Sequence, residues 1–191
     1  MKMDAIMRLA PVIPVLIVDD ARHARAIAEP LVAGGLRVLE VTLRTPAALA
    51  VIAEMAKVEG AIVGAGTVLN PKQLDDSVRA GARFIVSPGL TDRLAHEASD
   101  AGVPFLPGVA TAGEIMRGLD LGLDRFKFFP AEAAGGIKAL AAQSAPFPRV
   151  RFCPTGGVRA ETMADWLKLD SVLCVGGTWL VPKGPPDPVR I

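Results

Sequence analysis

Short runs of β-branched and other apolar residues alternate with Ala- and Leu-rich stretches along the whole chain. Eight of these runs predict β-strands, and they span residues 12–18, 37–44, 61–67, 84–88, 104–109, 125–130, 151–157 and 171–178. Helix start signals occur in the stretches between them. Asn70-Pro71 and Thr45-Pro46, for example, each supply an N-cap side chain followed by a proline suited to a first helical turn.

Regular alternation of strands with helices predicts parallel strands joined by right-handed crossovers. Eight units in 191 residues leave about 24 residues for each, which is enough for a strand, a helix and short loops. We therefore predict an α/β fold, a (β/α)8 TIM barrel, as a single domain over residues 1–191. An open doubly wound sheet is the alternative, but the first run ends in Val18-Asp19-Asp20 rather than a glycine-rich turn.

The end of the chain departs from a complete barrel. Residues 179–191 are rich in proline and glycine, and these residues do not continue a helix. We therefore expect the eighth helix, which would follow the last strand, to be missing or truncated.

Composition excludes several classes of protein. Hydrophobic residues make up 51% of the chain and charged residues 21%, which excludes a disordered chain. A net charge of +1 predicts no nucleic-acid partner and no anionic membrane surface. No apolar run reaches the ~18 residues of a membrane helix. Cys153 and Cys174 lie in apolar runs and are expected to be reduced, buried thiols in a cytoplasmic protein. Two histidines are too few for a multi-histidine metal centre, so we expect no metal or cofactor.

Lys127 is the most unusual residue, because it lies inside a predicted strand while the other six of the seven lysines lie in predicted helices or loops. Alternation places Lys127 and Phe129 on one face and Phe126 and Phe128 on the other. Helices cover the outside of a barrel, so Lys127 should point into the lumen. Burial disfavours an ammonium, and a neutral amine is a nucleophile toward ketones, as Schiff-base catalysis requires. A structural lysine paired with a buried carboxylate, or one that reaches the barrel rim, fits this segment equally well.

A second polar face occurs in the predicted strand 37–44. Alternation places Glu40, Thr42 and Arg44 together on the inner face, opposite Leu39 and Val41. A buried glutamate can exchange protons with a substrate, and an arginine can bind a carboxylate with its planar fork. Taken alone, this face is explained more simply by a Glu40–Arg44 salt bridge.

Glycine-rich segments close the last two predicted strands, at Pro154-Thr155-Gly156-Gly157 and at Gly176-Gly177-Thr178. In barrels, the loops after strands seven and eight commonly bind phosphate. Turn formation explains either segment alone, whereas the pair favours a phosphate site. A third segment, Gly64-Ala65-Gly66-Thr67, carries small residues that leave room in the lumen, and Thr67 is suited to bind a substrate oxygen. Cys153 shares a face with Thr155 and is expected to be a packed thiol.

The chain also resembles a known family through motifs that occur in a fixed order. They are Glu40-Val-Thr-Leu-Arg44, Gly64-Ala-Gly-Thr67-Val-Leu-Asn, Ser87-Pro-Gly-Leu, Phe126-Lys127-Phe-Phe-Pro-Ala-Glu, Cys153-Pro-Thr-Gly-Gly157 and Val175-Gly-Gly-Thr-Trp-Leu-Val-Pro. These motifs are similar to those of the bacterial 2-keto-3-deoxy-6-phosphogluconate (KDPG) aldolases, over residues 12–182. The resemblance implies a metal-independent class I aldolase of the Entner–Doudoroff pathway, on a (β/α)8 barrel, usually a homotrimer. Such enzymes often also cleave 4-hydroxy-2-oxoglutarate (KHG).

The resemblance implies a role for each matched residue. Lys127 would form the Schiff base and Glu40 would be the general acid/base. The implied substrate-binding residues are Arg44 and Thr67 at the pyruvyl carboxylate, Pro88 and Phe129 as walls of the pyruvate pocket, Thr155 at the aldehyde end, and Gly156, Gly157, Gly176, Gly177 and Thr178 around the phosphate. Thr178 stands where relatives often carry serine. The implied partners are a phosphorylated 2-keto-3-deoxy sugar acid and pyruvate, and the short C-terminus departs from the family.

Two other functions fit the same barrel. A sugar-phosphate isomerase or epimerase would use Glu40 as its base and would not need Lys127. A non-catalytic phosphosugar-binding barrel would need only the phosphate loops.

Overall fold

The computed structural model describes residues 1–181, 184 and 186 of the chain, which contain eight strands and eight α-helices. The strands are β1 (Val12–Leu16), β2 (Val38–Thr42), β3 (Ile62–Gly66), β4 (Ile85–Ser87), β5 (Phe105–Val109), β6 (Arg125–Phe128), β7 (Arg151–Pro154) and β8 (Val175–Gly177). The α-helices are α1 (Met3–Met7), α2 (Ala24–Ala33), α3 (Ala48–Met55), α4 (Pro71–Arg79), α5 (Asp92–Asp100), α6 (Ala112–Asp120), α7 (Gly136–Ser144) and α8 (Met163–Leu167). A 3₁₀ turn, η1 (Ala21–His23), precedes α2.

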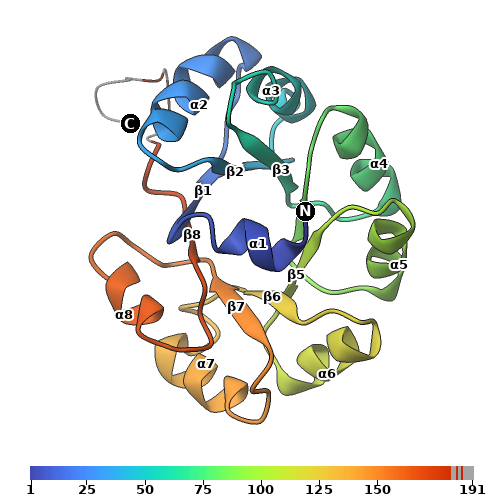
Figure 1. Ribbon diagram of the computed structural model, residues 1–191, viewed down its shortest axis with the longest axis vertical. Coiled ribbons are helices and arrows are strands. Elements are labelled where there is room, and N and C mark those ends of the chain that lie inside the picture. The colour runs from blue at the N-terminus through green and yellow to red at the C-terminus, as the bar shows by residue number, and fades with distance from the viewer. Residues whose placement is uncertain (182–183, 185, 187–191) are drawn as a thin grey trace.

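The strands form one parallel sheet that curls into a barrel ringed by helices (Figure 1). Their order is β7-β6-β5-β4-β3-β2-β1-β8, so β1 to β6 each pair with the next strand in the chain and β1 also pairs with β8. Two bridges, Phe152 with Val172 and Thr155 with Gly176, join the β7 side to the β8 side. The predicted (β/α)8 barrel is confirmed, and each strand lies within its predicted run but is shorter.

The two faces of the strands bury different kinds of residue. Outward-facing Leu39 and Val41 of β2 pack in a cluster with apolar residues of α2 and α3, and outward-facing Phe126 and Phe128 of β6 pack with residues of α6, α7 and α8. This arrangement follows from period-two alternation against a layer of amphipathic helices. The opposite, inner faces therefore bring the polar residues of β2 and β6 into the lumen.

Helix α1 closes the amino-terminal end of the barrel, and Figure 1 shows it lying across the centre of the ring. Its buried residues Met3, Ile6 and Met7 have the i, i+3, i+4 spacing of one helix face. They pack against the inner apolar layer, which comprises Ile13, Val38, Ile62, Phe84, Val86, Leu106, Cys153 and Cys174. Helix α1 does not cover the carboxyl-terminal end of the barrel. This is the end at which barrel enzymes bind their substrates.

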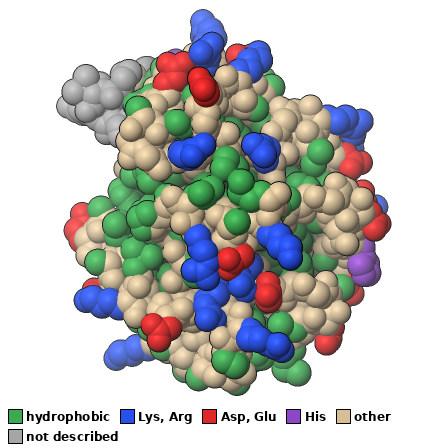
Figure 2. Space-filling model, viewed as in Figure 1, with side chains coloured by type: hydrophobic (Ala, Val, Ile, Leu, Met, Phe, Trp, Pro, Cys, Tyr) green, Lys and Arg blue, Asp and Glu red, His purple; other side chains and the backbone are tan. Residues whose placement is uncertain are grey.

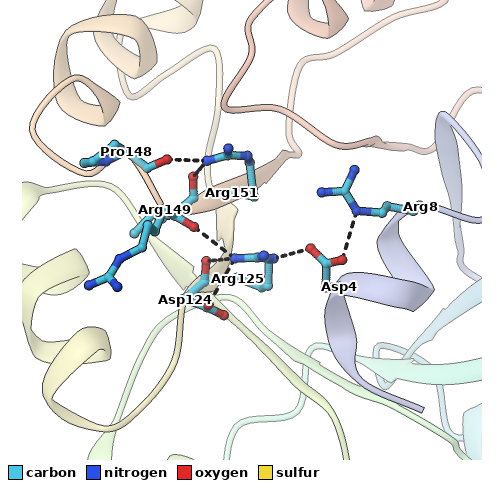
Figure 3. Close-up of polar contacts among 8 residues, drawn as sticks. Asp4, Arg8, Asp124, Arg125, Pro148, Arg149 and Arg151 are labelled. Carbon is cyan, nitrogen blue, oxygen red and sulfur yellow. Dashed lines mark hydrogen bonds and ion pairs between the residues drawn. The ribbon is translucent and has the colours of Figure 1, made fainter.

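Charged side chains gather on the face that α1 covers (Figure 2). In Figure 3, Asp4 of α1 accepts hydrogen bonds from Nε of Arg125 at 2.7 Å and from Nε of Arg8 at 2.9 Å. Arg125 also donates through Nη1 to the backbone carbonyls of Asp124 and Arg149. This network joins α1 to the beginning of β6.

Helix starts follow the sequence signals in one case and not in another. Asn70 caps α4 as predicted, accepting a hydrogen bond from the backbone N–H of Gln73 at 3.0 Å. The predicted start at Thr45-Pro46 is wrong, because α3 begins at Ala48. The Thr45 hydroxyl instead donates to the backbone carbonyl of Val18 at 2.7 Å.

The C-terminal segment is only partly described. Residues 179–181, 184 and 186 form no helix, and the rest of the segment predicted to lack a complete eighth helix lies outside the described residues. Within the described part of the chain, no helix is both long and apolar enough to cross a membrane.

Candidate functional site

Lys127 lies inside the barrel, as its position in the strand predicts. Its neighbours Phe126 and Phe128 point outward, where Phe126 packs against Phe152 and Phe128 against Trp166, in each case with ring centroids 6.3 Å apart. These contacts fix the outer face of β6, so the lysine side chain must enter the lumen. Lys127 is 6% exposed.

Glu40 of β2 meets Lys127 inside the barrel. The Nζ atom of Lys127 donates a hydrogen bond to Oε1 of Glu40 at 3.3 Å, and Glu40 is 3% exposed. The expected Glu40–Arg44 salt bridge is wrong, because the carboxylate pairs with the lysine. Arg44 is exposed in the turn that follows β2, so it does not enter the interior with Glu40 and Thr42.

The Lys127–Glu40 pair satisfies both interpretations of the lysine. It is a lysine paired with a buried carboxylate, and it is also an amine next to a proton acceptor inside an enclosed barrel. The ring of Phe129 lies beside it, with its centroid 5.2 Å from Nζ. A carboxylate and an aromatic face both interact favourably with a cation, so a positive charge on this nitrogen is stabilised by its surroundings.

Thr42, Thr67 and Pro88 lie at or just after the carboxyl ends of β2, β3 and β4. Thr42 is buried, and its hydroxyl donates a hydrogen bond to the backbone carbonyl of Leu16 at 3.0 Å. This bond ties the Thr42 side chain to the neighbouring strand β1. Thr67 follows β3 directly and has a φ of 58°, a left-handed conformation that is uncommon for a β-branched residue. Pro88 follows β4 and is half-buried. Thr67 and Pro88 therefore lie at the carboxyl ends of β3 and β4, and their substrate-binding roles stay predictions.

The predicted phosphate segment after β7 is joined to the segment after β6. Backbone N–H groups of Ala131 and Glu132 donate to the carbonyls of Thr155 and Gly156 at 2.8 and 3.0 Å. Gly156 and Gly157 have φ values of 98° and 83°, which glycine adopts without strain. The chain thus turns sharply at two glycines, and the space that a side chain would take is bordered by the ring of Phe129 at Gly156 and filled by the side chain of Glu132 at Gly157.

The predicted segment at the end of β8 divides into buried and exposed parts. Gly176 and Gly177 belong to β8, are buried and pair with Ile13 and Pro14 of β1. Their lack of side chains serves packing, because a Cβ on Gly176 would overlap Thr155 and one on Gly177 would overlap the ring of Trp179. Thr178 is exposed at the strand end.

The two cysteines are free and buried, as predicted. Both belong to the inner apolar layer. A hydrogen bond with Cys153 and burial hold the pKa of the Cys174 thiol well above its ordinary value. This thiol therefore stays protonated and has no role as a nucleophile.

The structure also shows features that sequence reasoning missed. The room predicted at Gly64 and Gly66 is occupied, since the ring of Phe84 fills the space beside Gly64 and the carboxylate of Glu40 the space beside Gly66. The N-terminal helix closes the barrel, and its i, i+3, i+4 apolar spacing was the available signal. In the described ranges, no group of three or more His, Cys, Asp or Glu side chains is arranged to hold a metal ion.

Comparison with known proteins identifies similar chains. A family model described as "KDPG and KHG aldolase" matches residues 3–188. The KHG/KDPG aldolase of Escherichia coli (strain K12) is 55% identical over 180 residues, which cover 94% of this chain and 84% of that protein.

Two crystal structures superpose closely on this fold. The 2-keto-3-deoxy-6-phosphogluconate aldolase of Zymomonas mobilis ZM4 with 3-phosphoglycerate is 57% identical, with a TM-score of 0.96 over 98% of this chain and 90% of that one. The KDPG aldolase of Legionella pneumophila, with pyruvate captured at low pH as a covalent carbinolamine intermediate, is 46% identical, with a TM-score of 0.93 over 96% of this chain and 89% of that one.

Proposed function

Since the chain belongs to the KDPG and KHG aldolase family, we propose that it is a class I aldolase that cleaves 2-dehydro-3-deoxy-6-phosphogluconate to pyruvate and D-glyceraldehyde 3-phosphate. The observation that carries the proposal is the buried Lys127–Glu40 pair, with Nζ and Oε1 3.3 Å apart. An amine next to a carboxylate inside a barrel has what Schiff-base chemistry requires, namely a nucleophile and a proton acceptor. The Legionella relative, which holds pyruvate as a covalent carbinolamine, supports the same chemistry.

The first steps bind the ketone to the enzyme. Glu40 takes a proton from the ammonium of Lys127, and the freed amine attacks C2 of the keto acid to form a carbinolamine. Loss of water then gives an iminium ion on Nζ. The same carboxylate and the ring of Phe129, which lie 3.3 and 5.2 Å from Nζ, stabilise this cation.

The iminium ion is the electron sink for carbon–carbon cleavage. Glu40 removes the proton of the C4 hydroxyl, the C3–C4 bond breaks, and its electron pair moves through C2 onto nitrogen. D-Glyceraldehyde 3-phosphate leaves and a neutral enamine remains on Lys127. Protonation of the enamine at C3 and addition of water to the resulting iminium ion release pyruvate and restore the free lysine.

The remaining residues bind the two ends of the substrate. Arg44 and Thr67, at the ends of β2 and β3, bind the pyruvyl carboxylate, and Pro88 and Phe129 form the walls of the pyruvate pocket. Thr155 faces the aldehyde end. The phosphate end is bound by Gly156, Gly157 and Thr178, with Gly176 and Gly177 packing the strand that carries Thr178.

A second substrate follows from the division of the site into two ends. The covalent chemistry involves only the pyruvyl half, so a shorter keto acid such as 4-hydroxy-2-oxoglutarate would react in the same way to give pyruvate and glyoxylate. The Escherichia coli relative is named for both substrates. We further propose that the enzyme needs no metal ion and works in the cytoplasm as a homotrimer, in the Entner–Doudoroff pathway.

Reductive trapping tests the proposal. The protein is incubated with pyruvate and borohydride, and its intact mass and peptide masses are measured. We expect a gain of one carboxyethyl group, located on Lys127. The Lys127→Met variant should gain nothing, whereas Lys138→Met, which removes an exposed lysine of α7, should be labelled like the wild type.

A second assay separates the aldolase from an isomerase or epimerase and from a binding protein. It measures pyruvate release from the phosphorylated substrate with lactate dehydrogenase, in the presence of EDTA. An isomerase or epimerase would convert a sugar phosphate without releasing pyruvate and would retain its turnover in Lys127→Met. A binding protein would show neither trapping nor turnover. Either result would contradict the proposed aldolase.

A further inference from the structure

Gly66 on β3 lies against the carboxylate of Glu40, and the space that a side chain would fill at position 66 is taken by that carboxylate. A Cβ atom on Gly66 would lie 2.7 Å from Cγ and 2.8 Å from Cδ of Glu40, and closer still to Oε1. Separations under about 3.0 Å do not occur for real Cβ atoms. Glu40 can therefore hold its observed position only because residue 66 has no side chain.

The sheet register explains why these two residues meet. Gly66 pairs with Thr42, and Glu40 pairs with Gly64, so Gly66 lies one inward-facing position further along the strands than Glu40. Inward side chains lean along the strand direction. The Glu40 side chain extends past its own partner Gly64 and lies over Gly66, where its Oε1 reaches Nζ of Lys127 on the other side of the lumen.

We propose that Gly66 is a positioning residue, whose missing side chain sets the place of the Glu40 carboxylate beside Lys127. This inference rests on the proposed function, because it concerns the proton transfers assigned to Glu40. Gly66 itself does not touch the substrate. It acts by leaving the volume in which the carboxylate can sit at hydrogen-bond distance from the lysine.

Position 66 allows a clean test because its glycine is not needed for backbone conformation. Ten described glycines have positive φ values, and Gly66 is not one of them, so an alanine there meets no backbone strain. The atoms it would meet belong to the far part of a flexible side chain. Alanine should therefore displace the Glu40 carboxylate rather than the sheet. Because the Nζ–Oε1 distance is already 3.3 Å, a small displacement breaks this hydrogen bond.

The test is a double-mutant cycle between Gly66→Ala and Glu40→Gln. The readouts are kcat and KM for cleavage, and the rate at which pyruvate methyl protons exchange with D2O, which reports proton transfer at C3. In the wild-type background, Gly66→Ala should lower kcat and the exchange rate by about 100-fold, the order expected for a 1 Å misplacement, with a smaller change in KM. In the Glu40→Gln background, it should lower neither further, since no carboxylate remains to be displaced.

Two controls show where the effect acts. Gly113→Ala on α6 adds a Cβ that meets nothing within 4 Å and should leave activity unchanged. Gly66→Ala should still be trapped with pyruvate at Lys127. Equal fold-losses from Gly66→Ala in both backgrounds would overturn the inference. Absence of trapping in the wild type would instead overturn the proposed function.

Folding is checked through a second pair of variants. If Gly66→Ala does not fold, Gly66→Ala/Glu40→Ala should fold, because the shorter residue at position 40 vacates the space. Failure of both variants to fold would show that position 66 needs glycine for another reason, and would also overturn the inference.

Discussion

The carboxylate of Asp4 lies 2.7 Å from Nε of Arg125, which connects the helix that closes the barrel to the strand that carries Lys127. Arg125 and Lys127 are two residues apart on β6 and share its inner face. Side-chain exposure is 17% for Arg125 and 36% for Asp4, so the pair is only partly screened by solvent. Arg125 lies at the start of β6, where it contacts α1, and Lys127 lies two residues further along the strand.

We expect Asp4→Asn to lower the free energy of unfolding by about 1 kcal/mol, near the upper end for partly exposed ion pairs. For a protein of this size, that corresponds to a fall in Tm of about 2–4 °C. Thermal denaturation followed by circular dichroism at pH 7 measures it. Asp76→Asn is the matched control, because among the described residues Asp76 forms ion pairs with Lys72 and Arg79 of its own helix, and its loss should be smaller than that of Asp4→Asn.

The effect of Asp4 should depend on pH in a defined direction. Hydrogen bonds from Arg8 and then Arg125 lower the pKa of Asp4 below its ordinary value of 3.8. A lowered pKa in the folded state stabilises the protein above the ordinary pKa, and this contribution is lost as the pH falls through the lowered value. The stability difference between wild type and Asp4→Asn should be constant above about pH 5 and shrink below pH 3.8. A difference that grows in acid would contradict the assigned ion pair.

Glu40→Gln should separate Schiff-base formation from carbon–carbon cleavage. The amide keeps the size of the side chain but cannot accept the C4 hydroxyl proton, so we expect kcat to fall by about 10² to 10⁴. Trapping of pyruvate at Lys127 should persist at longer incubation times. Stopped-flow measurement of pyruvate release and timed borohydride quenches check the two steps. Equal turnover in Glu40→Gln and wild type would show that another group transfers the proton.

Alternation along single strands predicted the inward placement of Lys127 and Glu40 correctly. The reason is physical: each of the two strands is covered on one face by helices, so period two decides which side chains enter the lumen. The pairing between them was not predictable, because the two residues are 87 positions apart and no local pattern relates them. The sequence instead favours the nearer partner, Arg44.

The incorrect predictions arise where a strand ends. Alternation applied to Arg44 assumes that the strand continues, but β2 stops at Thr42 and the chain turns. The glycines that close β8 show the same dependence in a correct prediction, since Gly176 and Gly177 lie in the strand, as the run 171–178 predicts, and pair with β1. In both places a pairing with a distant strand decides where the strand stops, and such a pairing leaves little signal in the local residues.

Trp166 provides a test of packing around β6. It is fully buried against Phe128, and its indole N–H has no hydrogen-bond partner among the described residues. We expect Trp166→Phe to change the free energy of unfolding by no more than about 1 kcal/mol, because the lost contact area is offset by removal of an unpaired buried donor. Trp166→Ala should cost about 3–5 kcal/mol. Urea denaturation measures both, and a large loss in Trp166→Phe would mean that the N–H has a partner.

Thr67 should show a conflict between stability and activity. Backbone hydrogen bonds fix its two neighbours, from Leu43 N–H to the carbonyl of Gly66 at 2.8 Å and from Val68 N–H to the carbonyl of Val86 at 3.1 Å, and they hold Thr67 at a φ of 58°. This conformation costs a β-branched residue about 1–2 kcal/mol, and glycine relieves it at an entropic cost of about 0.5–1 kcal/mol. Thr67→Gly should therefore raise Tm slightly while raising KM, because it removes the hydroxyl that we propose binds the pyruvyl carboxylate. Thr67→Ser, which keeps the hydroxyl, should retain the wild-type KM. A lower Tm in Thr67→Gly would show that the backbone at this position is not strained. An unchanged KM would show that the hydroxyl does not bind the substrate.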